Sequence, residues 1–382
     1  MLASTRTIAG LFAAAAVIAI EAPTLQAQQA PAAAQAQQAP AAASPPAQAA
    51  TPAPPAPRGP WTRLAPFPEP AEEVLGAVAD GKLYVFAGLA PGWKPIGMVY
   101  EYDPAANKWT KKKPMPLATH HVAFVAHNDK IYGFGGFRLP ETGPGAWVPL
   151  DNAWEYDPAA DAWKELAPLP HKRGAAGAAV ANGKIYVVGG AGLPEGSKEA
   201  GIHPTRPQGV TGRVDEYDPA SNTWQQKASM PTPRNHHVVA AVNNKIYAIG
   251  GRIGAAFITS GTNTDVVEEF DPAANAWGPL KLKMPTPRSA TGFGVHNGLI
   301  IIAGGEYQDA KLLAAFKVVE AYDPAANSWQ TLPPMQFPRH GLAAGVIGDR
   351  FHTVSGDVQS ASSGGHVHVE YHDALMLAPA TR

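Results

Sequence analysis

The clearest pattern along the chain is a pair of short apolar stretches separated by two polar residues. In residues 236–251 the string HHVVAAV is followed by NN and then by KIYAIGG. Apolar, β-branched runs on either side of an Asn-Asn pair predict two antiparallel strands joined by a tight turn. The double glycine that ends the second run predicts a bend or a close approach to a neighbouring backbone.

This hairpin is one part of a unit that recurs along the chain. The string YDPAANKW at 102–109 returns with small changes at 156–163, 217–224, 270–277 and 322–329. In each copy Asp and Pro predict a turn, an Asn, or Asp161 in the second copy, tolerates a positive φ, and Trp opens a further strand that fills the space between units. A repeat of about 50 residues with four short strands is typical of β-propeller blades. The tryptophans that mark this repeat are Trp61, Trp109, Trp163, Trp224, Trp277 and Trp329.

The order of the strands also predicts how the ring closes. The last unit has an inner hairpin at 339–356 and a third strand at 366–373, but no Trp strand follows them. The first unit opens with the Trp61 strand and has nothing before it. We therefore predict an all-β, six-bladed propeller with four antiparallel strands per blade. The N-terminal Trp61 strand is expected to join and complete the C-terminal blade.

With its apolar run, double glycine and spaced Tyr and Trp, each unit resembles the Kelch-repeat family. The resemblance covers residues 61 to about 375 and implies the Kelch six-bladed fold. The chain departs from the pattern at AG 87–88 and SG 355–356. Ile301 and His352 also stand where the other units have Tyr. Because Kelch propellers serve different functions, the fold alone does not assign one.

The first 60 residues differ in composition from the repeats. Arg6, the apolar run 8–20 and the string TLQA predict a signal peptide over 1–27, cleaved after Ala27. The Ala-, Pro- and Gln-rich segment 28–60 predicts a disordered linker, and the propeller is expected over 61–378. We therefore expect a periplasmic or secreted protein with no membrane insertion after cleavage. The formal net charge of −1 gives no reason to expect a nucleic acid as partner.

A shared register places one position of every unit where the chain enters the innermost strand, and four of the six units carry arginine there. The next position carries His120 and His340, and the residues that follow the double glycines, among them Arg252 and Glu306, are expected at the same mouth. Converging arginines predict recognition of an acidic ligand through forked hydrogen bonds. The alternative is that each arginine is a feature of the repeat that bonds blade carbonyls or a neighbouring carboxylate. The arginines at the shared position are Arg173, Arg234, Arg288 and Arg339.

Two adjacent-histidine pairs suggest a metal site at first sight. Neighbouring strand residues point to opposite faces, so His236 and His237 do not share an ion unless the strand is bulged, and the same holds for His120 and His121. The histidines of HVH at 366–368 share a face, but the sequence supplies no third ligand near them. We therefore expect no metal ion, no other cofactor and no catalytic residues.

These observations favour an exported Kelch-repeat binding module that recognises an acidic glycan or peptide at its mouth. The alternative is an acidic-sugar mutarotase, because the periplasmic N-acetylneuraminate epimerases resemble this chain in length, compartment and blade number. Copper chemistry of the galactose oxidase kind, also on a Kelch propeller, is disfavoured because its cofactor is a tyrosine cross-linked to cysteine, and this chain contains no cysteine.

Overall fold

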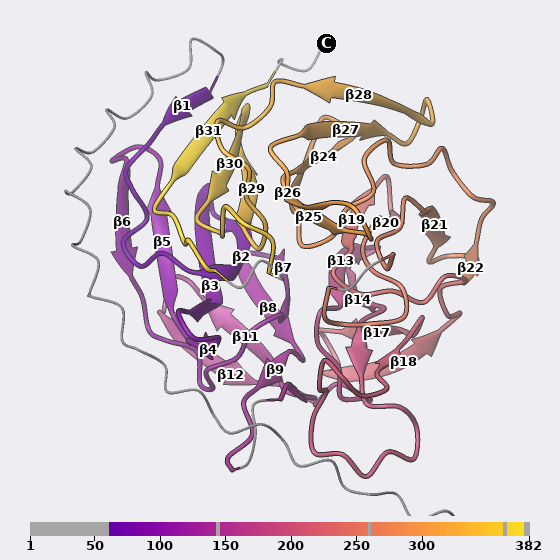
Figure 1. The fold of residues 1–382 in the computed structure, drawn as a ribbon. Coiled ribbons are helices and arrows are strands. Elements are labelled where there is room, and N and C mark those ends of the chain that lie inside the picture. Colours follow the sequence, from indigo (N-terminus) through magenta and orange to yellow (C-terminus); the bar gives the residue numbers. More distant parts are fainter. Residues whose placement is uncertain (1–60, 143–145, 259–260, 362–364, 378–382) are drawn as a thin grey trace, which may run out of the picture. The chain divides into compact units, whose positions relative to one another are not determined.

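The computed structural model describes residues 61–142, 146–258, 261–361 and 365–377, which form a ring of six antiparallel sheets (Figure 1). The described residues contain strands and no α-helix, which confirms the all-β, six-bladed prediction. Accordingly, no described helix is long and apolar enough to cross a bilayer. The predicted signal peptide and linker, residues 1–60, lie outside the described residues.

Each blade has four main strands that run in order from the axis to the rim. The innermost strands of blades 1 to 6 are β2 (Glu72–Ala79), β7 (Ala123–His127), β13 (Gly177–Ala181), β19 (Val238–Val242), β23 (Gly292–His296) and β29 (Ala343–Ile347). The second strands are β3 (Lys82–Ala90), β8 (Lys130–Phe134), β14 (Lys184–Val188), β20 (Lys245–Ile249), β24 (Leu299–Ala303) and β30 (Arg350–Val354). The third strands are β5 (Val99–Asp103), β11 (Ala153–Asp157), β17 (Val214–Asp218), β21 (Val267–Asp271), β27 (Val319–Asp323) and β31 (His372–Met376). The outer strands are β6 (Lys108–Lys111), β12 (Ala162–Glu165), β18 (Thr223–Lys227), β22 (Ala276–Trp277), β28 (Ser328–Leu332) and β1 (Trp61–Arg63).

Short strands in the connections extend the blades at one end of the ring. β4 (Lys94–Pro95) pairs with β3, and three two-stranded ribbons follow the second strands of blades 2, 3 and 5. The ribbons are β9 (Phe137–Arg138) with β10 (Val148–Pro149), β15 (Ala191–Gly192) with β16 (Gly209–Val210), and β25 (Glu306–Gln308) with β26 (Leu313–Ala315).

The ring closes as predicted, because β1 pairs antiparallel with β31 and Trp61 lies opposite Leu375. In Figure 1 the indigo N-terminal strand lies beside the yellow C-terminal one. The third strand of this blade, however, is β31 at 372–376 rather than 366–373. Residues 366–369 instead bond the segment after β30, where Val369 N–H donates to the Gly356 carbonyl. The alternation of residues that predicted a strand from position 366 therefore belongs, in its first part, to a connection at the end of the ring.

The Asp-Pro turns tie each blade to the one before it. In blade 1 Asn107 has a φ of 48°, and its side-chain oxygen accepts the Ala65 N–H at 2.9 Å. Trp109 donates its indole N–H to the Ala65 carbonyl at 3.1 Å. Equivalent indole bonds recur at Trp163, Trp224, Trp277 and Trp329. The repeated string therefore serves the contact between blades.

Candidate functional site

The innermost strands begin at the mouth, the end of the ring that carries the short ribbons. One register position there has a left-handed backbone in all six blades, with φ between 52° and 57°. Backbone N–H groups at this position bond the carbonyl of the preceding blade, as in His236 to Ala175 at 2.9 Å. The left-handed residue interrupts the regular strand and so breaks the alternation of side chains from which the two histidine pairs were interpreted. The six residues are Glu73, His121, Ala175, His236, Ala290 and Gly341.

Because of this left-handed backbone, His121 and His236 lie together although a whole blade separates them. Their ring centroids are 4.5 Å apart, and His121 Nε2 lies 3.2 Å from Glu73 Oε2. Burial, followed by the charge of Arg252, holds the pKa of His236 well below its usual value. Burial opposes ionisation of Glu73, yet His121, His340 and Arg252 lower its pKa to about 2. The group therefore combines a neutral imidazole with an ionised carboxylate.

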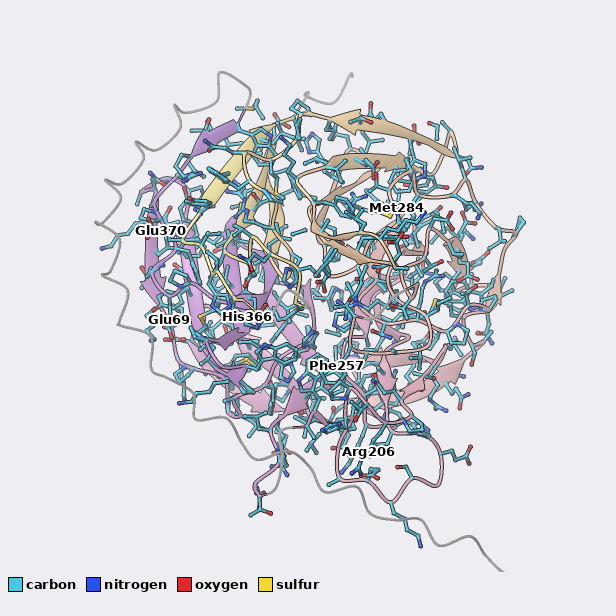
Figure 2. The ribbon with its side chains drawn as sticks, viewed as in Figure 1. Glu69, Arg206, Phe257, Met284, His366 and Glu370 are labelled. Carbon is cyan, nitrogen blue, oxygen red and sulfur yellow. The ribbon has the colours of Figure 1, made fainter. Side chains whose placement is uncertain are left out.

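Above these residues lies a cavity of about 330 Å³, referred to here as the mouth cavity. Trp93, Trp147 and Phe257 cover it, with the rings of Trp147 and Phe257 stacked at 3.9 Å between centroids. Phe257 lies toward the middle of the ring in Figure 2, whereas Glu69 lies near its rim. The floor of the mouth cavity is formed by Glu72, Glu73, His121, His236, Arg252 and Glu306. The cavity thus has an aromatic cover and a charged floor.

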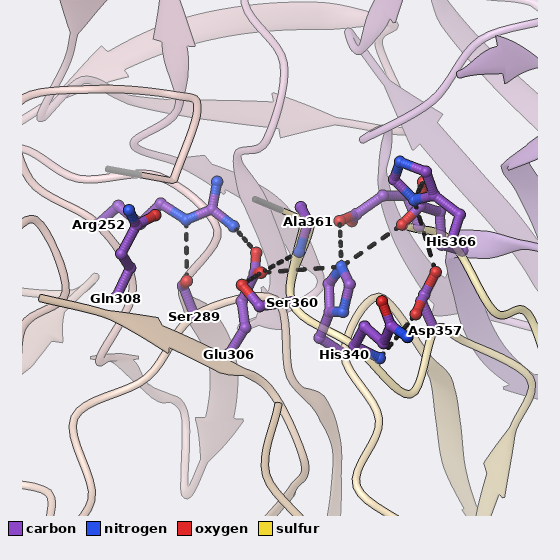
Figure 3. Close-up of polar contacts among 12 residues, drawn as sticks. Arg252, Ser289, Glu306, Gln308, His340, Asp357, Ser360, Ala361 and His366 are labelled. Atoms are coloured by element: carbon purple, nitrogen blue, oxygen red, sulfur yellow. Dashed lines mark hydrogen bonds and ion pairs between the residues drawn. The ribbon is translucent and has the colours of Figure 1, made fainter. Parts of the chain in front are cut away.

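Three of the predicted site residues meet in one polar network at this floor (Figure 3). Arg252 forms a buried ion pair with Glu306, whose other carboxylate oxygen accepts the Ser360 hydroxyl at 2.8 Å. His340 Nε2 lies 3.9 Å from Glu306 Oε2 and 3.5 Å from Glu72 Oε2. Burial alone would lower the pKa of His340, but the surrounding carboxylates raise it. Arg252 is therefore the cation that lines the mouth cavity, whereas His340 is fully buried among these carboxylates and does not line it.

His120 lies next to this network but does not line the mouth cavity. Its Nδ1 contacts His121 Nδ1, and its ring meets the Trp147 ring at 4.9 Å between centroids. Burial, followed by His121, holds the pKa of His120 well below its usual value. His120 is thus placed to orient His121.

The other four predicted arginines point into their own blades. All are at most 2% exposed, and each bonds a backbone carbonyl of the second strand or, for Arg339, of Ser355 directly after it. Each also pairs with a third-strand carboxylate at 2.5–3.2 Å. These contacts match the alternative stated above, and contact with a ligand stays a prediction. The pairs are Arg173–Asp215, Arg234–Glu268, Arg288–Glu320 and Arg339–Asp373.

Two groups of side chains at the mouth offer the donor types that metal ions bind. Glu73, His121 and His236 form one, and their donor atoms all lie within 4.8 Å of one another. The second combines the HVH histidines with two carboxylates that the sequence does not place nearby. That second group is Glu72, Asp357, His366 and His368.

Sequence reasoning missed several residues of this site. The register alone shows that Ala175, Ala290 and Gly341 are small where Glu73, His121 and His236 are not. This contrast is a usable signal for side chains that share the axis. The covering aromatic residues lie in connections of irregular length, and no repeat marks them.

Comparison with known proteins agrees with this architecture. Residues 200–356 match the family model described as the KLHDC2/KLHL20/DRC7 Kelch-repeats domain, and 74–116 and 118–170 match the Kelch motif. The chain is 28% identical over 285 residues to Kelch-like protein terF of Aspergillus terreus, covering 72% of this chain and 59% of that protein. It is 27% identical over 286 residues to Kelch-like protein 23 of Homo sapiens, covering 74% and 45%. It is 29% identical over 191 residues to beta-scruin of Limulus polyphemus, covering 50% and 20%.

The chain spans about half the length of the first two of these relatives. The matched segments fall in every blade, and the double glycines and Tyr–Trp spacing are present in the fold as in the sequence. The chain is a Kelch-repeat β-propeller.

Proposed function

We propose that this chain is an exported protein-interaction module whose ligand occupies the mouth cavity. The observation that carries the proposal is the cavity itself, which combines an aromatic cover with charged groups held by a rigid ring. Kelch repeats support a role in protein binding. The relatives described above are Kelch-like proteins, and they give the mutarotase alternative no support.

The ligand that we propose presents an acidic group to Arg252 and a flat or apolar part to the aromatic cover. The carboxylates of Glu72, Glu73 and Glu306 face the same cavity. An acidic group therefore approaches a floor with more carboxylates than cations, and it binds well only if a further positive charge offsets them. Because Kelch repeats support a role in protein binding, the acidic ligand that we propose is a peptide, and an acidic glycan is its comparator.

Calorimetry of the purified protein with acidic peptides, basic peptides, uronic-acid oligomers and sialic acid tests the proposal. We expect an acidic peptide to bind, and Phe257→Ala to weaken that binding at least about tenfold because stacking on the cover is lost. Leu280→Ala, which removes an exposed side chain outside the cavity, serves as the matched control. If no peptide or glycan binds, or if Phe257→Ala binds as well as the parent, the mouth cavity is not the ligand site.

Export is a separate part of the proposal. The charge, apolar run and small residues that precede position 28 favour cleavage after Ala27. We expect mass spectrometry of protein recovered outside the cytoplasm to show Gln28 as its first residue. Recovery of the chain from the cytoplasm with its first 27 residues intact would contradict this.

A further inference from the structure

Three residues at the narrow point of the axis have the composition of a metal site. Glu73, His121 and His236 occupy the left-handed register position in blades 1, 2 and 4. The same position in the other three blades carries only Ala or Gly, so no bulky side chain competes for the space on the axis. Their three donor atoms lie within 4.8 Å of one another, close to the spacing of ligands around a single ion.

The imidazoles of His121 and His236 are each contacted at Nδ1 by a neighbouring side chain, which leaves their Nε2 atoms directed to the axis. The Asn235 amide N–H donates to the Ala255 carbonyl at 2.9 Å, which turns the amide oxygen toward His236 Nδ1. Because an amide oxygen only accepts, His236 carries its proton on Nδ1 and a lone pair on Nε2. That Nε2 is buried and has no hydrogen-bond partner among the described residues. A buried acceptor without a partner is costly unless something binds it.

His121 has a comparable support. Its Nδ1 faces His120 Nδ1, and its Nε2 faces Glu73. When His121 donates its Nδ1 proton to His120, its Nε2 lone pair is free to bind an ion. A ring nitrogen held by a neighbour while the other binds a metal is the usual arrangement of a ligating histidine.

The second group of donors at the mouth is less suited to an ion. Trp93 donates its indole N–H to His366 Nε2 at 2.6 Å. Since indole nitrogen is only a donor, His366 carries its proton on Nδ1, which lies 3.1 Å from Glu72 Oε1. Asp357 already accepts the Val367 N–H at 2.8 Å. Two of the four donors, His366 and Asp357, are therefore already engaged by neighbouring groups, whereas Glu72 Oε2 and His368 Nε2 have no hydrogen-bond partner among the described residues.

We propose that Glu73, His121 and His236 bind one divalent transition-metal ion, with an open coordination position toward the mouth cavity. Two imidazole nitrogens and one carboxylate suit Zn²⁺ or Fe²⁺, whereas Mg²⁺ prefers oxygen ligands. All three residues line the mouth cavity, so a bound ion is within reach of a ligand there. The ion also supplies positive charge that offsets the carboxylates of the floor.

The test is a calorimetric titration of the full chain with ZnCl₂ after treatment with EDTA and dialysis, and a parallel titration with MgCl₂. We expect one Zn²⁺ per chain and no comparable binding of Mg²⁺. Co²⁺ serves as a spectroscopic probe, because its visible d–d absorption reports nitrogen and oxygen ligands directly. No ligand is present in these titrations, so their result does not depend on the proposed function.

Variants locate the ion. His236→Gln is expected to weaken Zn²⁺ binding at least about tenfold and to abolish the Co²⁺ absorption. His237→Gln is the matched control, because the neighbouring ring packs beside Gly189 and is not part of the donor group. His368→Gln tests the second group of donors in the same way, and both controls are expected to bind like the parent.

Circular dichroism confirms folding, and Glu73→Gln replaces His236→Gln if the latter does not fold. Zn²⁺ is expected to raise the melting temperature of the parent but not of His236→Gln. The proposal is overturned if the folded parent binds neither Zn²⁺ nor Co²⁺ in a one-to-one ratio. It is equally overturned if His236→Gln binds like the parent, or if His368→Gln alone abolishes binding.

Discussion

At the scale of single residues, Arg234 shows how a charge is held inside a blade. Its guanidinium is buried, donates to the Ala248 carbonyl at 2.8 Å and pairs with Glu268 at 2.9 Å. The third strand carries Asp or Glu in the four units that carry such an arginine. In the two units that do not, it carries Tyr100 or Trp154 instead. This joint change follows from the cost of burying an unpaired charge, and it is a sign in the sequence that these arginines belong to the blades.

Removal of Arg234 alone is therefore expected to lower the free energy of unfolding far more than replacement of both Arg234 and Glu268. Arg234→Ala leaves Glu268 buried and unpaired, which should lower the free energy of unfolding by about 3–5 kcal/mol. The double variant with Glu268→Tyr reproduces the Ala71 and Tyr100 pair of blade 1 and should recover most of this loss. Urea denaturation measures both effects. If the folded double variant no longer binds the acidic peptide, Arg234 contacts the ligand after all.

A second expectation at this scale concerns two histidines between blades 6 and 1. His352 and His372 are buried, and their ring nitrogens are 3.0 Å apart. Burial, followed by the charge of Arg350, lowers the pKa of His352 to about 4. Burial, followed by His352, lowers that of His372 to about 3. Both rings are therefore neutral in the folded protein at pH 5, where unfolded histidine is mostly protonated.

Because the unfolded chain then binds more protons, stability should fall as the pH drops from about 7 to 5. The loss should be about 2–4 kcal/mol for the pair. Urea denaturation at both pH values measures it. The double variant His352→Gln, His372→Gln should lose less stability over the same range, and an equal loss in both proteins would rule out these two histidines as its source.

At the scale of elements, β1 completes blade 6. It contributes a three-residue ladder to β31, an indole bond from Trp61 to the Pro333 carbonyl at 2.9 Å, and an ion pair from Arg63 to Asp373. Without it β31 becomes an exposed sheet edge. Strand order along the chain was sufficient to predict this closure, because a Trp strand was missing at one end and present at the other.

Deletion of residues 61–68 should therefore destabilise the whole ring. The lost ladder and aromatic packing are worth about 2–3 kcal/mol. In a ring of this size it corresponds to a fall in melting temperature of about 3–5 °C. A chain that begins at residue 60 provides the reference in a thermal melt followed by circular dichroism. Equal melting temperatures would mean that β1 does not hold blade 6 closed.

At the scale of the whole molecule, the repeat made the blades predictable, whereas the site depends on departures from it. Arg252, Glu306 and His340 could be placed at the mouth, because the register carries every unit to the same end of the ring. Glu73, His121 and His236 could not, because the left-handed backbone that directs them to the axis breaks the alternation of a regular strand. The cover of Trp93, Trp147 and Phe257 comes from three connections whose paths only the fold determines.

The floor of the mouth cavity links the metal ion and the ligand. An ion held by Glu73, His121 and His236 offsets the neighbouring carboxylates and offers an open position to an acidic group. We therefore expect Zn²⁺ to raise the affinity for an acidic peptide at least about tenfold and to leave that for a basic peptide unchanged or weaker. Reciprocity requires the acidic peptide to tighten Zn²⁺ binding by the same factor.

Calorimetry of the EDTA-treated and the Zn²⁺-loaded protein measures both sides of this coupling. His236→Gln should retain the weak, metal-independent affinity for the peptide, because the aromatic cover is intact, and should show no response to Zn²⁺. Phe257→Ala should lose peptide affinity in both states while still binding the ion. Equal peptide affinities with and without Zn²⁺ would show that the ion and the peptide bind independently, and the acidic group would then depend on Arg252 alone.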